Sequence, residues 1–178
     1  MPRYALLIRG INVGGRSKLA MSDLRELLTG LGCHDVRTHL QSGNAVFASP
    51  QRSQPALAAR IEKAIGNELG LSVRCLTRNA SELRSVIEGN PFSGIATEGS
   101  RFLALFLAAE PDSGLLAAND PCALAPAYIR LGDRVIYQWC PDGILQAPNV
   151  SSFVERKLKV AVTGRNWNTV TKLGELMS

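Results

Sequence analysis

The residues best suited to chemistry lie in a glycine-rich stretch, residues 10–17, with the spacing G-x-x-x-x-G-R-S. This differs by one residue from the phosphate-binding pattern G-x-x-x-x-G-K-S/T, in which backbone N–H groups surround phosphate oxygens. Arg16 stands where that pattern has lysine, and the following helix is predicted to begin late, near Met21. No strand ends in an acidic residue placed to complete a magnesium site, so nucleoside-triphosphatase chemistry is not expected.

A simpler anion site remains a hypothesis for this stretch. Gly14 and Gly15 precede Arg16 and Lys18 ahead of a predicted helix. Such an arrangement can form a nest of backbone N–H groups that binds an anion. The alternative is a plain connection between a strand and a helix, whose glycines allow positive φ angles.

Hydrophobic periodicity predicts the elements that would position this stretch. In the first half we expect strands over residues 3–8, 36–40, 45–47 and 71–77, and helices over 21–31 and 55–69. In the second half we expect strands over 102–108, 128–131, 135–139 and 160–162, and helices over 81–88, 113–118, 150–158 and 166–176. Both halves contain the order β-α-β-β-α-β. The sequence therefore predicts an α+β protein of two tandem ferredoxin-like (βαββαβ) units, residues 1–78 and 79–178, with an extra C-terminal helix.

The ferredoxin-like topology would bring two loops together. In such a unit the end of the first strand and the turn between the second and third strands lie at the same edge of the sheet. That edge would carry cations and amides without a carboxylate, namely Arg9, Asn12, Arg16, Lys18, Gln41, Ser42 and Asn44. Such a set suits the binding of phosphate, carboxylate or nucleotide better than acid–base catalysis. The alternative is that Asn12, Ser42 and Asn44 only bond the backbone of their own turns.

The start of the last predicted helix allows two interpretations. Asn166 or Asn168 would be its N-cap, and Trp167 would hold the helix against the rest of the protein. In the functional alternative, Arg165 and Asn166 reach the same anion site from the second half.

Alternating aromatic residues raise the question of nucleic-acid binding. Tyr137 and Trp139 share one face of a predicted strand, and Phe102 and Phe106 share one face of another. RNA-recognition modules expose aromatic residues on such strands. We favour packing in the core, because the more apolar face of a strand usually turns inward and the basic string of those modules is absent.

Composition further restricts the classes of protein to which this chain can belong. The net charge of +5 is mild and spread along the chain, which permits an anionic partner without requiring one. The four cysteines form no Cys-x-x-Cys pair and there are two histidines, so we expect no metal, no cofactor and no disulfide framework. Reduced thiols suggest a cytoplasmic protein.

No apolar run approaches the ~20 residues that cross a bilayer, so no association with a membrane is expected. His39, Ser42 and Asp35 lack the context of a hydrolase triad, and no catalytic residue is assigned.

Several strings of residues occur in the order found in one bacterial family. They are R-G-I-N-V-G-G at residues 9–15, M-x-D-L-R at 21–25, Q-S-G-N at 41–44, N-P-F at 90–92 and R-N-W-N-T-V at 165–170. Together they resemble the family catalogued as domain of unknown function 1697. The resemblance implies a two-part ferredoxin-like α+β fold and no activity. Members of the family often carry a Ser-Lys-Leu-type basic string after the Pro-Asp-Gly turn, where residues 144–148 here are I-L-Q-A-P.

Our leading hypothesis is the binding, with or without weak catalysis, of a small phosphate-bearing anion at the edge formed by residues 10–17 and 41–44. One alternative is a nucleic-acid-associated protein that uses the arginines and strand aromatics. Another is a structural or protein-interaction module without a small ligand. The sequence leaves the ligand's identity and the oligomeric state open.

Overall fold

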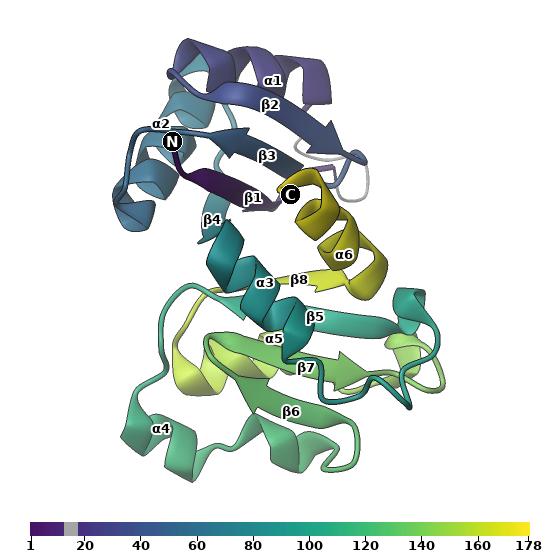
Figure 1. Ribbon diagram of the computed structural model, residues 1–178. Helices are drawn as coiled ribbons and strands as arrows, with labels where there is room; N and C mark the ends of the chain where they lie inside the picture. Colours follow the sequence, from purple (N-terminus) through teal and green to yellow (C-terminus); the bar gives the residue numbers. More distant parts are fainter. Residues whose placement is uncertain (13–17) are drawn as a thin grey trace. The chain divides into compact units, whose positions relative to one another are not determined.

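A computed structural model describes residues 1–12 and 18–178 of the chain (Figure 1). These residues form two compact units, Met1–Arg84 with Lys172–Ser178, and Ser85–Thr171. The described residues contain six α-helices and two four-stranded antiparallel sheets, so the fold is α+β.

The division between the two units falls inside two helices, α3 (Ala80–Glu88) and α6 (Trp167–Leu176). The expected domains, residues 1–78 and 79–178, remain a prediction about how the chain divides. Within the described part of the chain, none of the helices has the length and apolar character needed to span a membrane.

The first unit contains the sheet of order β2-β3-β1-β4. Its elements follow one another as β1 (Arg3–Arg9), α1 (Met21–Gly30), β2 (His34–His39), β3 (Asn44–Ala48), α2 (Gln54–Leu69) and β4 (Arg74–Asn79). Strand β1 lies in the interior of the sheet and pairs with both β3 and β4. The end of β1 therefore meets the beginnings of β3 and β4 at one edge.

Local sequence signals define the ends of α2. The Ser53 hydroxyl accepts a hydrogen bond from the N–H of Ala56 at 3.3 Å, which satisfies a donor of the first turn. The helix ends at Gly70, whose φ of +67° is left-handed and costs glycine little.

Helices α1 and α2 cover one face of the first sheet (Figure 1). Leu6 and Ile8 of β1 face these helices and pack in one cluster with Leu24 of α1 and Ile61 of α2. All four side chains are almost completely buried, and each contributes roughly 1.5–3 kcal/mol through burial. Because side chains alternate along a strand, Arg9 at the end of β1 belongs to the opposite face.

The second unit contains the sheet of order β6-β7-β5-β8. Its elements are β5 (Phe102–Leu107), α4 (Ser113–Ala118), β6 (Ile129–Gly132), β7 (Val135–Trp139), α5 (Val150–Phe153) and β8 (Val162–Asn166). A π-helix, Val154–Leu158, continues α5, and short 3-10 helices lie at Gly99–Arg101, Pro121–Leu124 and Ile144–Gln146. One core of this unit joins Leu105 and Ile136 of the sheet to Val150 and Val154.

Two strands differ most from the sequence prediction. Strand β4 begins at Arg74 instead of residue 71, and β8 runs to Asn166 instead of ending at residue 162. The start of β4 and the end of β8 are both set by long-range pairing, since Arg74 pairs with Arg9 and Asn166 pairs with Leu103. The residues from Arg165 to Asn166, expected at the start of the last helix, are therefore strand residues.

Candidate functional site

The described ends of the two expected loops adjoin at the edge where β1 ends and β3 begins. The N–H of Ile8 donates to the carbonyl oxygen of Gly43 at 2.9 Å. Gly43 has a φ of +84°, and a Cβ atom placed on it would lie 2.8 Å from Cδ1 of Ile11 and 3.0 Å from Cβ of Ile8. Only glycine satisfies both the conformation and the close approach. We call this edge, with Arg9, Asn12, Gln41, Ser42 and Asn44, the first-sheet rim.

Asn12 fixes the first loop to the hairpin turn. Its Oδ1 accepts a hydrogen bond from the N–H of Leu19 at 2.9 Å, and its Nδ2 donates to the carbonyl oxygen of Leu19 at 3.1 Å. The same Nδ2 donates to the carbonyl oxygen of Gln41. Asn12 also has a φ of +54°, a conformation that asparagine tolerates better than most residues. Its amide therefore organises the backbone on both sides of the rim.

Asn44 and Ser42 organise the turn itself. Asn44 is completely buried, and its Nδ2 donates to the carbonyl oxygen of His39 at 3.1 Å and to the Ser42 hydroxyl at 2.9 Å. The bond to His39 matches the interpretation in which Asn44 bonds the backbone of its own turn. Ser42 is itself exposed, as are Arg9 and Gln41 of the rim and the nearby Lys18.

Arg9 has a cationic neighbour that the sequence analysis missed. In the register of β1 and β4, Arg9 pairs with Arg74, so the two arginines lie on the same face of the sheet. Both are exposed. Like charges directly opposite each other destabilise a sheet. An anion bound between these arginines would offset that repulsion.

Further basic residues share this face. His39 pairs with Asn44, which pairs with Leu7, and Leu7 lies on the same face as Arg9 because it is two residues away. Arg37 pairs with Val46 on the same face and is exposed. Arg37 and His39 therefore lie on the same face as Arg9, around the buried apolar side chains of Ala5, Leu7 and Val46.

Arg3 shows how an arginine on this face is neutralised within the chain. Its Nη1 lies 3.7 Å from Oδ2 of Asp35, and its Nη2 donates to the carbonyl oxygen of Leu176 at 3.3 Å. Asp35 therefore serves as a counter-ion to Arg3. This ion pair agrees with the view that Asp35, His39 and Ser42 do not form a hydrolase triad.

The remaining predicted site residues lie elsewhere. Gly14, Gly15 and Arg16 fall outside the described residues. Arg165 and Asn166 lie in β8 of the second unit, and their approach to the first-sheet rim stays a prediction.

Arg165 and Asn166 both form hydrogen bonds with residues close to them in the sequence. Nη1 of Arg165 donates to the carbonyl oxygen of Gly164 at 2.8 Å, and burial lowers the pKa of Arg165 to about 10. Oδ1 of Asn166 accepts a hydrogen bond from the N–H of Thr169 at 3.0 Å. Asn166 therefore acts as the N-cap of α6, which was one of the two candidates.

The described residues do not support metal or thiol chemistry. They include no group of three or more His, Cys, Asp or Glu side chains that could hold a metal ion. All four cysteines are free thiols, and burial raises the pKa of each, including Cys33 and Cys140. A thiol that stays protonated is a poor nucleophile.

The strand aromatics form a buried cluster in the second unit. The ring of Phe102 stacks on Trp167 with centroids 4.5 Å apart and meets Phe92 edge-on at 6.0 Å. The Tyr137 hydroxyl donates to the carbonyl oxygen of Val86 at 2.7 Å. Phe102 is 0% exposed and Tyr137 4% exposed. These rings pack in the core, as we favoured, and are not placed to stack on bases.

Comparisons with known proteins identify a family but no activity. The family model described as "Protein of unknown function (DUF1697)" matches residues 1–137, a range that includes the first-sheet rim. No curated protein matches the chain. The conserved bacterial protein SP0830 from Streptococcus pneumoniae has a solved structure similar to this one, with a TM-score of 0.69 and 24% sequence identity over 99% of each chain. That likeness concerns the fold alone.

Proposed function

We propose, for a chain that belongs to the family described as "Protein of unknown function (DUF1697)", that the first-sheet rim binds a small phosphate-bearing anion. The description of the family names no activity, so the proposal comes from the chemistry of the rim. Its main support is the pairing of Arg9 with Arg74 across two neighbouring strands.

Two guanidinium groups on adjacent strands suit a phosphate-bearing ligand. Residues directly opposite in an antiparallel pair have Cβ atoms roughly 4.5–5.5 Å apart, so both side chains can reach one phosphate or two linked phosphates. The planar guanidinium group offers paired N–H donors that match phosphate oxygens. A diphosphate-type ligand would place charge opposite both arginines, which makes inorganic pyrophosphate a suitable probe.

The hydrogen bonds of the two asparagines support this proposal by fixing the backbone beneath the cations. Asn12 and Asn44 hold the first loop and the turn, so less conformational entropy is lost when a ligand binds. We include Lys18 and Gln41 as exposed contributors. Gly14, Gly15, Arg16, Arg165 and Asn166 remain predicted contributors to the same site.

Calorimetric titration with inorganic pyrophosphate tests the proposal. Arg74→Gln removes one guanidinium while keeping a polar side chain of similar length, and we expect affinity to fall roughly tenfold to a hundredfold, since a charge-assisted bond contributes about 1.5–3 kcal/mol. Arg60→Gln is the matched control, because Arg60 is exposed on α2, outside the strands and the turn that form the rim. An equal loss in both variants would indicate general charge attraction and would contradict a defined site.

The same titration separates the alternatives. Tight binding of single-stranded RNA with a steep salt dependence, without binding of pyrophosphate, would favour a nucleic-acid-associated protein. If neither ligand binds and Arg74→Gln changes only stability, the rim serves the fold alone. The burial of the strand aromatics already makes the nucleic-acid alternative less favoured.

We also propose that the two units are ferredoxin-like repeats, residues 1–78 and 79–178. The two halves share the order β-α-β-β-α-β, and their strand orders, β2-β3-β1-β4 and β6-β7-β5-β8, correspond position by position. Superposition of the two sheets in an experimental structure tests this, and a poor match of the four strands would refute it. The four free cysteines support a cytoplasmic location, which cell fractionation would check.

A further inference from the structure

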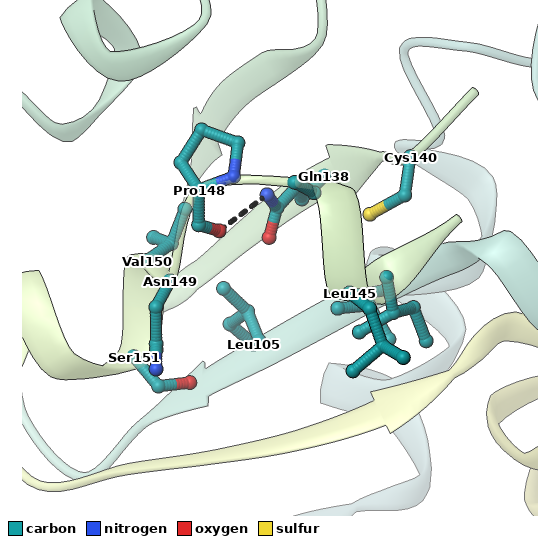
Figure 2. Close-up of a pocket in the computed structure, with 11 residues that line it drawn as sticks. Leu105, Gln138, Cys140, Leu145, Pro148, Asn149, Val150 and Ser151 are labelled. Carbon is teal, nitrogen blue, oxygen red and sulfur yellow. Dashed lines mark hydrogen bonds between the residues drawn. The ribbon is translucent and has the colours of Figure 1, made fainter. Parts of the chain in front are cut away.

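A cavity of about 320 Å³ lies in the second unit, on the face of the sheet that packs against α5 (Figure 2). Its floor includes Leu103 and Leu105 of β5 and Val150 at the start of α5. Its wall is formed by the segment that precedes α5, with Leu145 and Pro148. Leu145 is 97% exposed, so an apolar side chain stands at the mouth of the cavity. The lining contains no charged residue.

The cavity contains one buried polar group with unused hydrogen-bonding capacity. Gln138 of β7 lines the cavity and is only 2% exposed. Its Nε2 donates to the carbonyl oxygen of Pro148 at 2.9 Å, whereas none of the described residues donates a hydrogen bond to its Oε1. Figure 2 shows the amide nitrogen directed at Pro148 and the oxygen turned away from it, toward the space between the lining residues.

A carbonyl oxygen in such surroundings favours a ligand that donates a hydrogen bond. Oε1 of Gln138 is not among the side-chain atoms that are sealed from water without a partner. A ligand that enters the cavity would displace water from this oxygen, and a donor on the ligand would replace the hydrogen bond that water supplies. The hydrogen bond from Nε2 of Gln138 to the carbonyl oxygen of Pro148 fixes the orientation of Oε1. Burial also raises the pKa of the Cys140 thiol in the lining, so the lining remains uncharged near neutral pH.

The volume limits the size of the ligand. An apolar cavity of ~150 Å³ admits benzene, and this cavity has about twice that volume. We propose that it binds a small uncharged molecule with an apolar body of about the size of a fused two-ring system, and with one N–H or O–H group that donates to Oε1 of Gln138. This inference is independent of the first-sheet rim, because it concerns the second unit and an uncharged ligand.

Indole and benzothiophene provide a matched pair of probes. They have nearly the same shape and apolar area, and indole alone carries an N–H donor. Titrations followed by calorimetry and by the backbone amide signals of the full chain should show indole binding ~3–10-fold more tightly, the range that one hydrogen bond supplies. The signals that shift should include those of Gln138 and Val150. Equal affinity for the two probes, or shifts confined to other residues, would overturn the proposal.

Two variants and a control test the assignment to this cavity. Gln138→Leu should remove the preference for indole while keeping benzothiophene affinity within about threefold, since only the hydrogen bond is lost. Leu103→Trp should fill the cavity and abolish the binding of both probes. Leu115→Met is the control, because Leu115 packs against the same core without lining the cavity. Melting temperatures establish that each variant is folded. Unchanged indole affinity in folded Leu103→Trp, or a retained indole preference in Gln138→Leu, would refute the proposal.

Discussion

Arg9, the last residue of β1, lies directly opposite Arg74, the first residue of β4. The pairing places two positive charges at the edge of the first sheet where the hairpin turn meets Ile11 and Asn12. Opposed like charges lower the stability of a sheet by a fraction of a kcal/mol to about 1 kcal/mol. A protein that binds an anion there has a physical reason to keep this arrangement.

The repulsion between the two arginines should depend on salt. At low ionic strength we expect Arg74→Gln to be as stable as the wild type or more stable, because one of the opposed charges is gone. Sodium chloride should stabilise the wild type more than the variant, since salt screens exposed charges. Urea unfolding at low and high salt measures both effects, with Arg60→Gln as the control. A salt response that is the same in all three proteins would show that the pairing carries no repulsion.

Replacement of Gly43 should reveal the close approach of the turn to β1. Gly43→Ala combines a φ of +84° with a Cβ 2.8 Å from Cδ1 of Ile11, and we expect it to cost about 2–4 kcal/mol. Gly143→Ala is the matched control, because Gly143 has a φ of +95° but no atom within 4 Å of an added Cβ. It should cost only about 1–2 kcal/mol. Ile11→Val removes Cδ1 and should partly rescue Gly43→Ala. Equal costs at the two glycines, measured by urea unfolding, would argue against the steric conflict.

Asn12 should contribute to stability through both its side chain and its backbone. Asn12→Ala loses the bonds to Leu19 and Gln41 and places alanine at a φ of +54°. We expect a loss of about 2–4 kcal/mol in the free energy of unfolding. Asn12→Gly should cost about 1 kcal/mol less, because glycine accepts the positive φ. The exposed Asn67→Ala on α2 is the control and should change stability by less than about 0.5 kcal/mol. Indistinguishable alanine and glycine variants would mean that the positive φ contributes nothing.

The buried thiols should make the protein less stable in mildly alkaline solution. Burial, with the nearby charge of Glu62, raises the pKa of the Cys75 thiol far above its ordinary value. The folded protein therefore keeps this proton while the unfolded chain loses it above about pH 8.5. Because the unfolded state then binds fewer protons, the free energy of unfolding falls as pH rises. The opposite contribution of Arg165, whose folded pKa is about 10, begins at higher pH.

Urea unfolding at about pH 7 and about pH 9 measures this fall. Cys75→Ala should reduce the difference between the two pH values, and the half-buried Cys122→Ala should reduce it less. The comparison uses the pH difference within each variant, so the cavity left by alanine does not affect it. A pH dependence in Cys75→Ala equal to that of the wild type would exclude a role for this thiol.

Local patterns in the sequence predicted most elements, because their signals lie within a few residues. Ile61 and Ile65 recur at helical spacing, and the segment from Val135 to Trp139 alternates and follows a turn. The start of β4 was not predictable in this way. Leu71 and Val73 look like strand residues because they are apolar, but they pack against the core outside β4.

The candidate site was predictable only in part, for the same physical reason. The loop residues Asn12 and Gln41 could be brought together from topology alone, whereas the pairing of Arg74 with Arg9 depends on the register of two strands far apart in sequence. The sequence signal that could have identified Arg74 as a site residue is an arginine near the start of the last strand of a β-α-β-β-α-β unit. The cavity at Gln138 could not be foreseen, because it depends on how the segment before α5 packs on the sheet.

The arginine side-chain Nε–H and backbone N–H signals of the full chain, followed during titration with inorganic pyrophosphate at about 0.15 M salt, test the central claim most directly. Saturable shifts of Arg9, Arg74 and Gly43, with Arg52 and Arg60 unchanged, are the result that a phosphate-bearing ligand at the first-sheet rim predicts. Uniform small shifts across all exposed arginines, or saturable shifts confined to the second unit, would contradict it.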